Sequence, residues 1–233
     1  MHRKSLFLIL ILALLLRLAA ISTRPLWYDE AFSVLFSSSG PSAMLAGTLT
    51  EQDGVAADVH PLLYYTLLWG WIKGLGGSPW AVRGFSVLMG LGVVILTYLL
   101  GRSIFDEKFG LLGAALVACS PFQIHYAQEA RMYVLMTFFL LSATYTLWWG
   151  TKTRRWGWWL LFAICSALAQ YTHNLSLFFL IPLAFSILLK GNRRALGAVT
   201  LGGLGALLLY APWLLRLPTQ FAKIQTAYWT PRP

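Results

Sequence analysis

The sequence predicts an all-α membrane protein: a polytopic bundle of about seven transmembrane helices that forms one domain over residues 1–233. Two compositional observations carry this prediction. Hydrophobic residues make up 58% of the chain, against roughly 45–50% in an ordinary soluble domain, and charged residues make up 11%, against about 25%. Such a chain has too few polar residues to cover a soluble globule, which excludes a soluble enzyme, a disulfide-stapled secreted domain and a disordered chain.

Seven apolar runs are candidates for spans, because crossing a hydrocarbon core of about 30 Å takes about 20 helical residues. The uncharged stretch 156–189 is long enough for two crossings, and the polar residues 171–174 mark the turn between them. The predicted spans are 6–21, 82–100, 109–121, 132–150, 156–170, 175–189 and 195–215.

Lysine and arginine in the short connections predict the orientation of these spans. With seven crossings, all four basic clusters fall on one side of the membrane. The N-terminus is therefore expected in the cytoplasm of a multi-pass protein of the plasma (inner) membrane. A cleaved signal peptide ending near residue 22 is the alternative for the first run, and Arg17 close to the cleavage position argues against it. The clusters are Arg3 and Lys4; Arg102 and Lys108; Lys152, Arg154 and Arg155; and Lys190, Arg193 and Arg194.

The net charge of +10 does not indicate a nucleic-acid partner, because the basic residues flank apolar runs instead of lining one solvated face. The expected environment is the lipid bilayer. Cys119 and Cys165 lie in or at the end of apolar runs and are expected to be small core residues.

The longest connection, residues 22–81, is predicted to be an extracytoplasmic loop that carries the functional site. Loops of this length are usually functional, and this one holds five of the eight acidic residues. Its uncharged segment 59–72 is short for a span and suits an interfacial helix, with Pro61 in the first turn.

Two adjacent carboxylates, Asp29 and Glu30, follow the first span among aromatic residues. They can complement the dipole at a helix N-terminus. They can also serve as a general base or as metal ligands, since apolar surroundings raise the basicity of a carboxylate.

Asp58 and His60 open the interfacial helix. Asp58 can act as its N-cap, and His60 can donate a hydrogen bond to an anion or bind a metal.

Glu129 and Arg131 lie in the short connection before the fourth span, where a minimal loop needs no charge. They can form an interfacial salt bridge, or Arg131 can grip a phosphate with two hydrogen bonds. Arg17 within the first span is a weaker candidate, because its side chain can extend to a lipid headgroup.

Three motifs together resemble the polyprenyl-phosphate-sugar-dependent glycosyltransferases of the GT-C fold, in particular protein O-mannosyltransferases and lipid A aminoarabinose transferases. The motifs are Trp-Tyr-Asp-Glu-Ala at 27–31, His60-Pro61 followed by Tyr64-Tyr65, and Gln-Glu-Ala-Arg-Met-Tyr at 128–133. Relatives often carry a basic residue and two prolines where this chain has His60-Pro61-Leu62. Because the family usually has eleven or more spans and about twice this length, we expect this chain to be an N-terminal half.

The resemblance implies transfer of a sugar, with inversion, from a polyprenyl-phosphate donor to a hydroxyl of a protein, lipid or glycan acceptor on the extracytoplasmic face. It implies Asp29 as the base, with Glu30 in support. Arg131 and His60 would meet the phosphate, and Asp58, Tyr64 and Glu129 would complete the substrate site.

A divalent metal bound by Asp29, Asp58, His60 or Glu129 is compatible with the resemblance, and no cofactor is required by it. The alternatives to an enzyme are a transporter or flippase subunit and a non-catalytic membrane scaffold. Convergence of Asp29, His60 and Arg131 in space would favour the enzyme.

Overall fold

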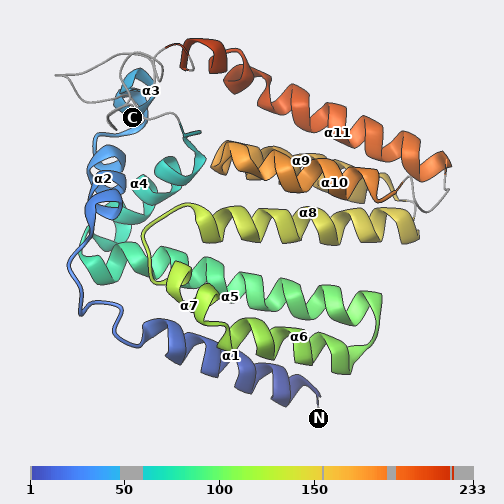
Figure 1. Cartoon of the computed structure of the whole chain (residues 1–233), viewed down its shortest axis with the longest axis horizontal. Coiled ribbons are helices and arrows are strands. Elements are labelled where there is room, and N and C mark those ends of the chain that lie inside the picture. The colour runs from blue at the N-terminus through green and yellow to red at the C-terminus, as the bar shows by residue number, and fades with distance from the viewer. Residues whose placement is uncertain (1, 48–59, 154, 188–192, 221, 223–233) are drawn as a thin grey trace, which may run out of the picture.

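The computed structural model describes residues 2–47, 60–153, 155–187, 193–220 and 222, and within these ranges all regular elements are helical. Long helices run side by side, and three short helices cover one end of the bundle (Figure 1). The helices that run along the bundle are α1 (His2–Leu18), α5 (Pro79–Ile104), α6 (Glu107–Cys119), α8 (Tyr133–Thr153), α9 (Trp156–Thr172), α10 (Leu177–Phe185) and α11 (Arg193–Leu214). The helices that cover the end are α2 (Tyr28–Ser38), α3 (Pro41–Gly47) and α4 (Leu63–Leu75).

Each of the seven predicted spans coincides with a helix, which confirms the helical membrane class. Among the described residues, α5, α8 and residues 195–214 of α11 are long and apolar enough to cross a bilayer, and α6 with the short helix α7 (Pro121–Ala127) makes a bent fourth. Helices α1 and α9 have 17 residues each, and α10 has nine. The count of seven crossings therefore stays a prediction.

The predicted turn within the long uncharged stretch is confirmed. Helix α9 ends at Thr172, and His173 has extended backbone angles (φ −161°, ψ 132°) before the 3-10 turn η1 (Asn174–Ser176) leads into α10. Without this polar break, the uncharged stretch 156–189 would form one helix about 51 Å long, which is too long for a single crossing.

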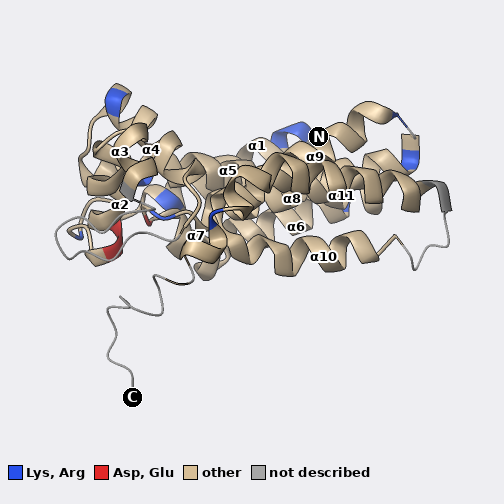
Figure 2. Ribbon diagram, turned by 90° about the horizontal axis from the view of Figure 1, so that it is seen from above, with Lys and Arg blue, Asp and Glu red and all other residues tan. Residues whose placement is uncertain are grey.

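The bundle has two chemically different ends. The start of α1, the ends of α5 and α8, and the starts of α6, α9 and α11 lie at one end, and they carry the described residues of the four basic clusters (Figure 1). Arg154 and Lys190 lie outside the described residues. The short helices α2–α4 lie at the opposite end, which we call the loop end, and the acidic residues of α2 are there (Figure 2). The helices are therefore arranged as the charge pattern predicts.

A bend of 62° separates α6 from α7, where the sequence predicted the end of a span at residue 121. Ser120 is the N-cap of α7, and Pro121 occupies its first turn. Arg17, completely buried, donates hydrogen bonds to the carbonyls of Val117 (3.2 Å) and Ala118 (3.1 Å) at the end of α6. Arg17 therefore satisfies the carbonyls of a helix end and does not extend to a headgroup.

Helix α4 is the predicted interfacial helix. Its 13 residues span about 20 Å, which is too short to cross the hydrocarbon core. It begins at Leu63, so Pro61 precedes the helix and does not occupy its first turn. The inner face of α4 buries Tyr64, Tyr65 and Leu68 in a core that supports the loop end. The other members of this core come from α3, α5, α8 and the connection before α8: Met44, Val82, Phe85, Ala130, Met132 and Leu135.

The orientation predicts which positions an impermeant thiol reagent reaches. In a protein with Cys119 and Cys165 replaced by alanine, Ser39→Cys at the loop end should react in intact cells. Thr153→Cys at the basic end should react only after the membrane is permeabilised, because basic connections are retained in the cytoplasm. Labelling of Thr153→Cys in intact cells would contradict the orientation.

Candidate active site

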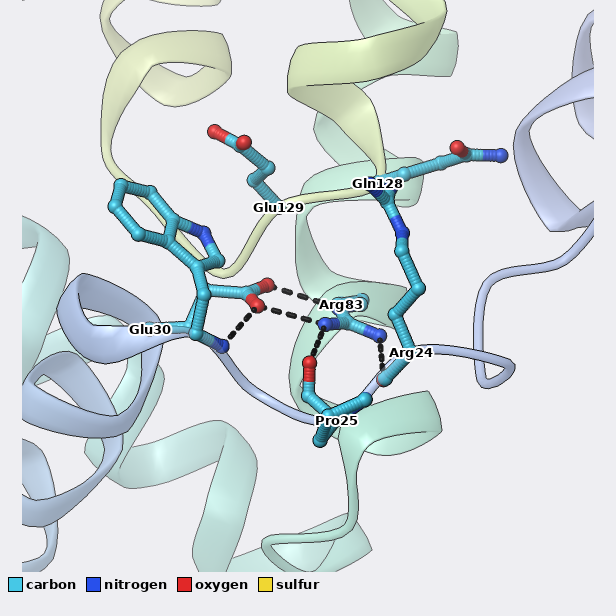
Figure 3. A pocket seen from close by; sticks show the side chains of 7 residues that line it. Arg24, Pro25, Glu30, Arg83, Gln128 and Glu129 are labelled. Carbon is cyan, nitrogen blue, oxygen red and sulfur yellow. Dashed lines mark hydrogen bonds and ion pairs between the residues drawn. The ribbon is translucent and has the colours of Figure 1, made fainter.

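A buried ion pair between Glu30 and Arg83 lies at the centre of the loop end (Figure 3). The Nε of Arg83 donates to Glu30 Oε1 at 2.8 Å, and its NH2 group donates to Oε2 at 2.7 Å. Both side chains are at most 4% exposed. Paired hydrogen bonds of this kind join a guanidinium and a carboxylate most strongly and fix their relative orientation.

The remaining donors of Arg83 bind the connection between α1 and α2. Its NH1 group donates to the carbonyls of Ile21 (2.7 Å) and Arg24 (2.9 Å), and NH2 donates to that of Pro25 (3.0 Å). All five N–H groups of the guanidinium are therefore used. A side chain of α5 thus positions the chain entering α2.

Glu30 also binds the connection between α7 and α8. Its Oε1 accepts from the backbone N–H of Ala130 at 2.8 Å, and its Oε2 accepts from that of Trp27, the N-cap residue of α2, at 3.3 Å. Burial raises the pKa of Glu30, but the hydrogen bonds from Arg83, Ala130 and Trp27 outweigh it and hold the pKa below its ordinary value. Glu30 is thus held as a carboxylate.

Asp29 precedes Glu30 in the chain, and Arg131 follows Ala130, whose N–H binds Glu30. The side chains of Asp29 and Arg131 face each other. The NH2 group of Arg131 lies 3.7 Å from Asp29 Oδ2, and NH1 lies 3.4 Å from the Asp29 carbonyl and 3.2 Å from the hydroxyl oxygen of Ser33. The Asp29 side chain is 35% exposed and that of Arg131 only 7%. At 3.7 Å the carboxylate is paired electrostatically but lies outside direct hydrogen-bond distance, so its oxygens remain accessible to a ligand.

Glu129 belongs to the same connection before α8 as Arg131. Its Oε1 is 3.2 Å from Nε2 of His125, and its side chain is 12% exposed. Burial raises the pKa of Glu129 above its ordinary value, against the opposing effect of His125. Its backbone carbonyl accepts from the Ser86 hydroxyl at 2.6 Å, which ties the connection to α5.

A pocket of about 310 Å³ opens beside the ion pair (Figure 3). Glu129 and Trp27 line it together with the Glu30–Arg83 pair, and its volume is at the lower end of the range for ligand pockets. Asp29 and Arg131 do not line it. The other lining residues are Arg24, Pro25 and Gln128.

The substrate residues predicted at the interfacial segment, Asp58, His60 and Tyr64, differ in position and burial, and only Tyr64 belongs to α4. Tyr64 is completely buried, where it packs against Tyr65 and Phe85, and burial raises its pKa against the opposing charge of Arg131. His60 is half-buried, and its ring lies 5.0 Å from that of His173 at the end of α9. Asp58 lies outside the described residues. The structure thus places Tyr64 behind the site surface, and its predicted contact with substrate stays a prediction.

No group of three or more His, Cys, Asp or Glu residues that could hold a metal ion occurs within the part of the chain that the structure describes. Asp29 and Glu129, two of the predicted ligands, contact different residues, Arg131 and His125 respectively. Asp58, a third, is outside the described ranges.

The model of the dolichyl-phosphate-mannose-protein mannosyltransferase family matches residues 59–215, more than half of the chain. This chain belongs to that family. The sequence is also 24% identical over 150 residues to the Bacillus subtilis (strain 168) protein named "Putative mannosyltransferase YkcB". That match covers 60% of this chain and 20% of the relative, so the chain spans about a fifth of the relative's length. The resemblance seen in the three motifs is confirmed.

Two residues of this family member were missed by the sequence analysis. Arg83 lies at the second position of the predicted span 82–100, where an arginine side chain ordinarily extends to the membrane interface, so its position alone gave no signal. His173 was interpreted only as part of a polar turn. Both are recognisable as site residues only once α2, α5 and α9 are packed together.

The Glu30–Arg83 pair predicts a stability that depends on pH. Glu30→Gln should lower the free energy of unfolding by about 3–5 kcal/mol at neutral pH, because it leaves the charge of Arg83 buried without its partner. Since the pKa of Glu30 is lowered in the folded state, the advantage of the wild type should be complete above the ordinary glutamate pKa of about 4.3 and should shrink as the pH falls below it. Unfolding of the detergent-solubilised protein would measure both effects.

Glu107→Gln is the matched control, since Glu107 lies at the basic end and its amide replacement can still accept from Tyr98, which donates to it at 2.9 Å. This variant should unfold close to the wild type. Equal stability of Glu30→Gln and the wild type at pH 7 would contradict a structural role for the pair.

Proposed function

We propose that the protein is a membrane glycosyltransferase that moves a sugar from a polyprenyl-phosphate donor to an acceptor hydroxyl on the extracytoplasmic face, with inversion at the sugar carbon. The observation that carries this proposal is the pairing of Asp29 with Arg131 at the loop end, from segments about 100 residues apart. A carboxylate and a guanidinium are the two groups that this reaction needs side by side.

In this reaction Asp29 accepts the proton of the acceptor hydroxyl as its oxygen forms a bond to C1 of the sugar. The bond between C1 and the phosphate oxygen breaks, and its electron pair leaves with the lipid phosphate. Asp29 suits the first task because its side chain is accessible and is held at the start of a helix. Glu30 does not touch the reacting atoms in this proposal and serves as a positioning residue for Asp29.

Arg131 meets the developing charge on the phosphate. Its Nε is buried and has no hydrogen-bond partner among the residues that the structure describes, and its NH groups make long contacts of 3.2–3.7 Å. Arg131 therefore contrasts with Arg83, whose five donors are all engaged at 3.0 Å or less. A phosphate would satisfy donor capacity that the protein leaves open.

The arrangement of charges favours an enzyme over a transporter. In a transporter, ionisable groups are expected along a path at mid-membrane. Here Asp29, Glu129 and Arg131 gather at one end of the bundle, and the buried Arg17 is engaged with helix carbonyls. The sugar and the acceptor class, whether protein, lipid or glycan, are to be identified by screening lipid extracts for donors.

Asp29→Asn should lower sugar transfer by about 10²–10⁴-fold, because the amide keeps the size of the side chain but cannot take the proton of the acceptor. Transfer is measured in membranes of cells that express the protein from its gene. Asp106→Asn is the matched control: Asp106 caps α6 at the basic end, and asparagine caps equally well. Near-normal transfer by Asp29→Asn at wild-type protein levels would refute the assignment of the base.

Arg131→Lys should reduce transfer, and Arg131→Ala should reduce it more. Lysine keeps the positive charge but loses the planar arrangement of donors that contacts two phosphate oxygens. The loss should appear in the dependence of the rate on donor concentration. Equal rates for the lysine variant and the wild type would exclude a two-point grip on phosphate.

A further inference from the structure

The pocket at the loop end has no role in the reaction proposed above. It has a volume of about 310 Å³ and opens beside the buried ion pair (Figure 3). Arg24 and Trp27 line it from the connection between α1 and α2, and Glu129 lines it from the connection before α8. Asp29 and Arg131 do not line it, so an occupant of the pocket contributes binding and does not hold the reacting atoms.

Three side chains of the pocket wall have hydrogen-bonding capacity that the protein does not use. Oε1 of Glu129 lies 3.2 Å from Nε2 of His125, whereas its Oε2 accepts no hydrogen bond within the described ranges. The indole N–H of Trp27 and the guanidinium of Arg24 make no hydrogen bond in these ranges either, although the backbone of each residue is bonded. The wall therefore offers one carboxylate oxygen and two kinds of donor to a ligand.

The same wall also has a flat apolar surface. Trp27 is 47% exposed, and Pro25 lines the pocket with it. A sugar ring has the matching chemistry, because its C–H faces are apolar while the hydroxyls at its edge both donate and accept hydrogen bonds. The volume, at the lower end of the range for ligand pockets, suits a ligand of the size of one ring.

The charges of the pocket favour a neutral ligand. The Glu30–Arg83 pair is neutral as a unit, and the charges of Glu129 and Arg24 oppose each other. An anion would meet two carboxylates, and a cation would meet two guanidinium groups. Burial raises the pKa of Glu129 against the opposing effects of His125 and Arg24. Hydroxyl groups that donate to Oε2 would replace the hydration that this carboxylate lost on burial.

We propose that this pocket is a subsite for a neutral sugar ring of the acceptor; the proposal rests on the function proposed above and selects a glycan or glycolipid among the acceptor classes. The C–H face of the ring packs on the Trp27 indole, and its hydroxyls donate to Glu129 Oε2 and accept from Arg24. The sugar of the donor is the other source of such a ring. Its C1 reacts beside Asp29 and Arg131, which do not line the pocket.

The competing explanation is structural: Glu129 would only pair with His125, and Trp27 would only anchor the loop end at the membrane interface. Two variants separate these roles from sugar binding. Glu129→Gln keeps the size of the side chain and an oxygen for His125, but it replaces the second carboxylate oxygen with an NH2 group. Trp27→Ala removes the indole and keeps the backbone N–H that binds Glu30.

Each variant has a matched control outside the pocket. Trp80→Ala removes an indole that is 56% exposed at the start of α5, and Glu107→Gln makes the same carboxylate-to-amide change at the basic end. Neither residue lines the pocket. Both controls should therefore bind sugars and transfer them as the wild type does.

A binding measurement tests the pocket without relying on turnover. The 11 tryptophans are labelled with 5-fluorotryptophan in micelles of a detergent without a sugar headgroup, and Trp27→Phe and Trp80→Phe assign two ¹⁹F signals. At least one of the methyl glycosides of mannose, glucose and galactose should shift the Trp27 signal and leave that of Trp80 unchanged. Cyclohexanol, a ring with a single hydroxyl, and inorganic phosphate should not shift it at the same concentrations.

Glu129→Gln should raise the glycoside concentration needed for half of this shift by about 10- to 100-fold, the size of a lost hydrogen bond to a charged group. An unchanged Trp27 signal with all three glycosides would overturn the proposal. An equal shift with cyclohexanol or with phosphate would also overturn it, because the pocket would then bind any apolar ring or an anion.

Kinetics distinguish the two sources of the sugar ring. In membranes of cells that express the protein from its gene, a glycolipid fraction is varied as acceptor and a lipid-linked sugar fraction as donor. Glu129→Gln should raise the KM for the acceptor by about 10- to 100-fold, and Trp27→Ala by about 2- to 10-fold, with kcat and the KM for the donor unchanged. A raised KM for the donor alone would overturn the assignment to the acceptor.

The proposed function and the sugar subsite fail in different ways. Transfer by a protein whose Trp27 signal no glycoside shifts would overturn the subsite and leave the proposed function standing. Glycoside binding by a protein that transfers no sugar would overturn the proposed function, and with it the assignment to an acceptor. A fall in kcat for both variants at unchanged KM would overturn the subsite in favour of a structural role.

Discussion

The geometry of the loop end depends on one buried ion pair. Removing Glu30 and Arg83 from water costs several kcal/mol for each charge, and this cost is offset only where hydrogen bonds satisfy every donor and acceptor. Arg83 uses all five N–H groups, and Glu30 accepts four hydrogen bonds. Because these bonds reach the α1–α2 connection, α2, α5 and the connection before α8, the pair can be satisfied only when all four segments are in place.

This constraint explains why the proposed reacting groups are neighbours of the pair. Asp29 precedes Glu30, and Arg131 follows Ala130, whose N–H binds Glu30. Peptide geometry then limits how far either residue can move. In the proposed function, the base and the phosphate-binding group are thus positioned by a neighbouring carboxylate that does not itself react, as a rigid supporting shell positions a site.

Much of the fold could be predicted from the sequence, because apolar runs and polar breaks are local signals. The turn at His173 and the two chemically different ends of the bundle follow from hydropathy and from the basic clusters. The meeting of Asp29 and Arg131 could be expected, because the predicted spans place both connections at the same end of the bundle; their roles in a site stay a prediction. The contacts of Arg83 and His173 could not be expected, because no local pattern indicates which residue 50 or 100 positions away will face a given side chain.

The charged residues of the bundle differ in how completely the protein itself satisfies them. Arg83 and Glu30 are engaged by several short hydrogen bonds, so this pair stabilises helix packing. Arg17 binds the carbonyls at the bend after α6, and its buried Nε has no hydrogen-bond partner among the described residues. Asp29 and Arg131 face each other at 3.7 Å in the same region, and the Asp29 side chain is accessible. A hydrophobic protein bears the cost of a poorly paired charge only where something else is gained. Incomplete pairing therefore distinguishes Asp29 and Arg131, the residues proposed to meet a substrate, from the Glu30–Arg83 pair, which holds the fold.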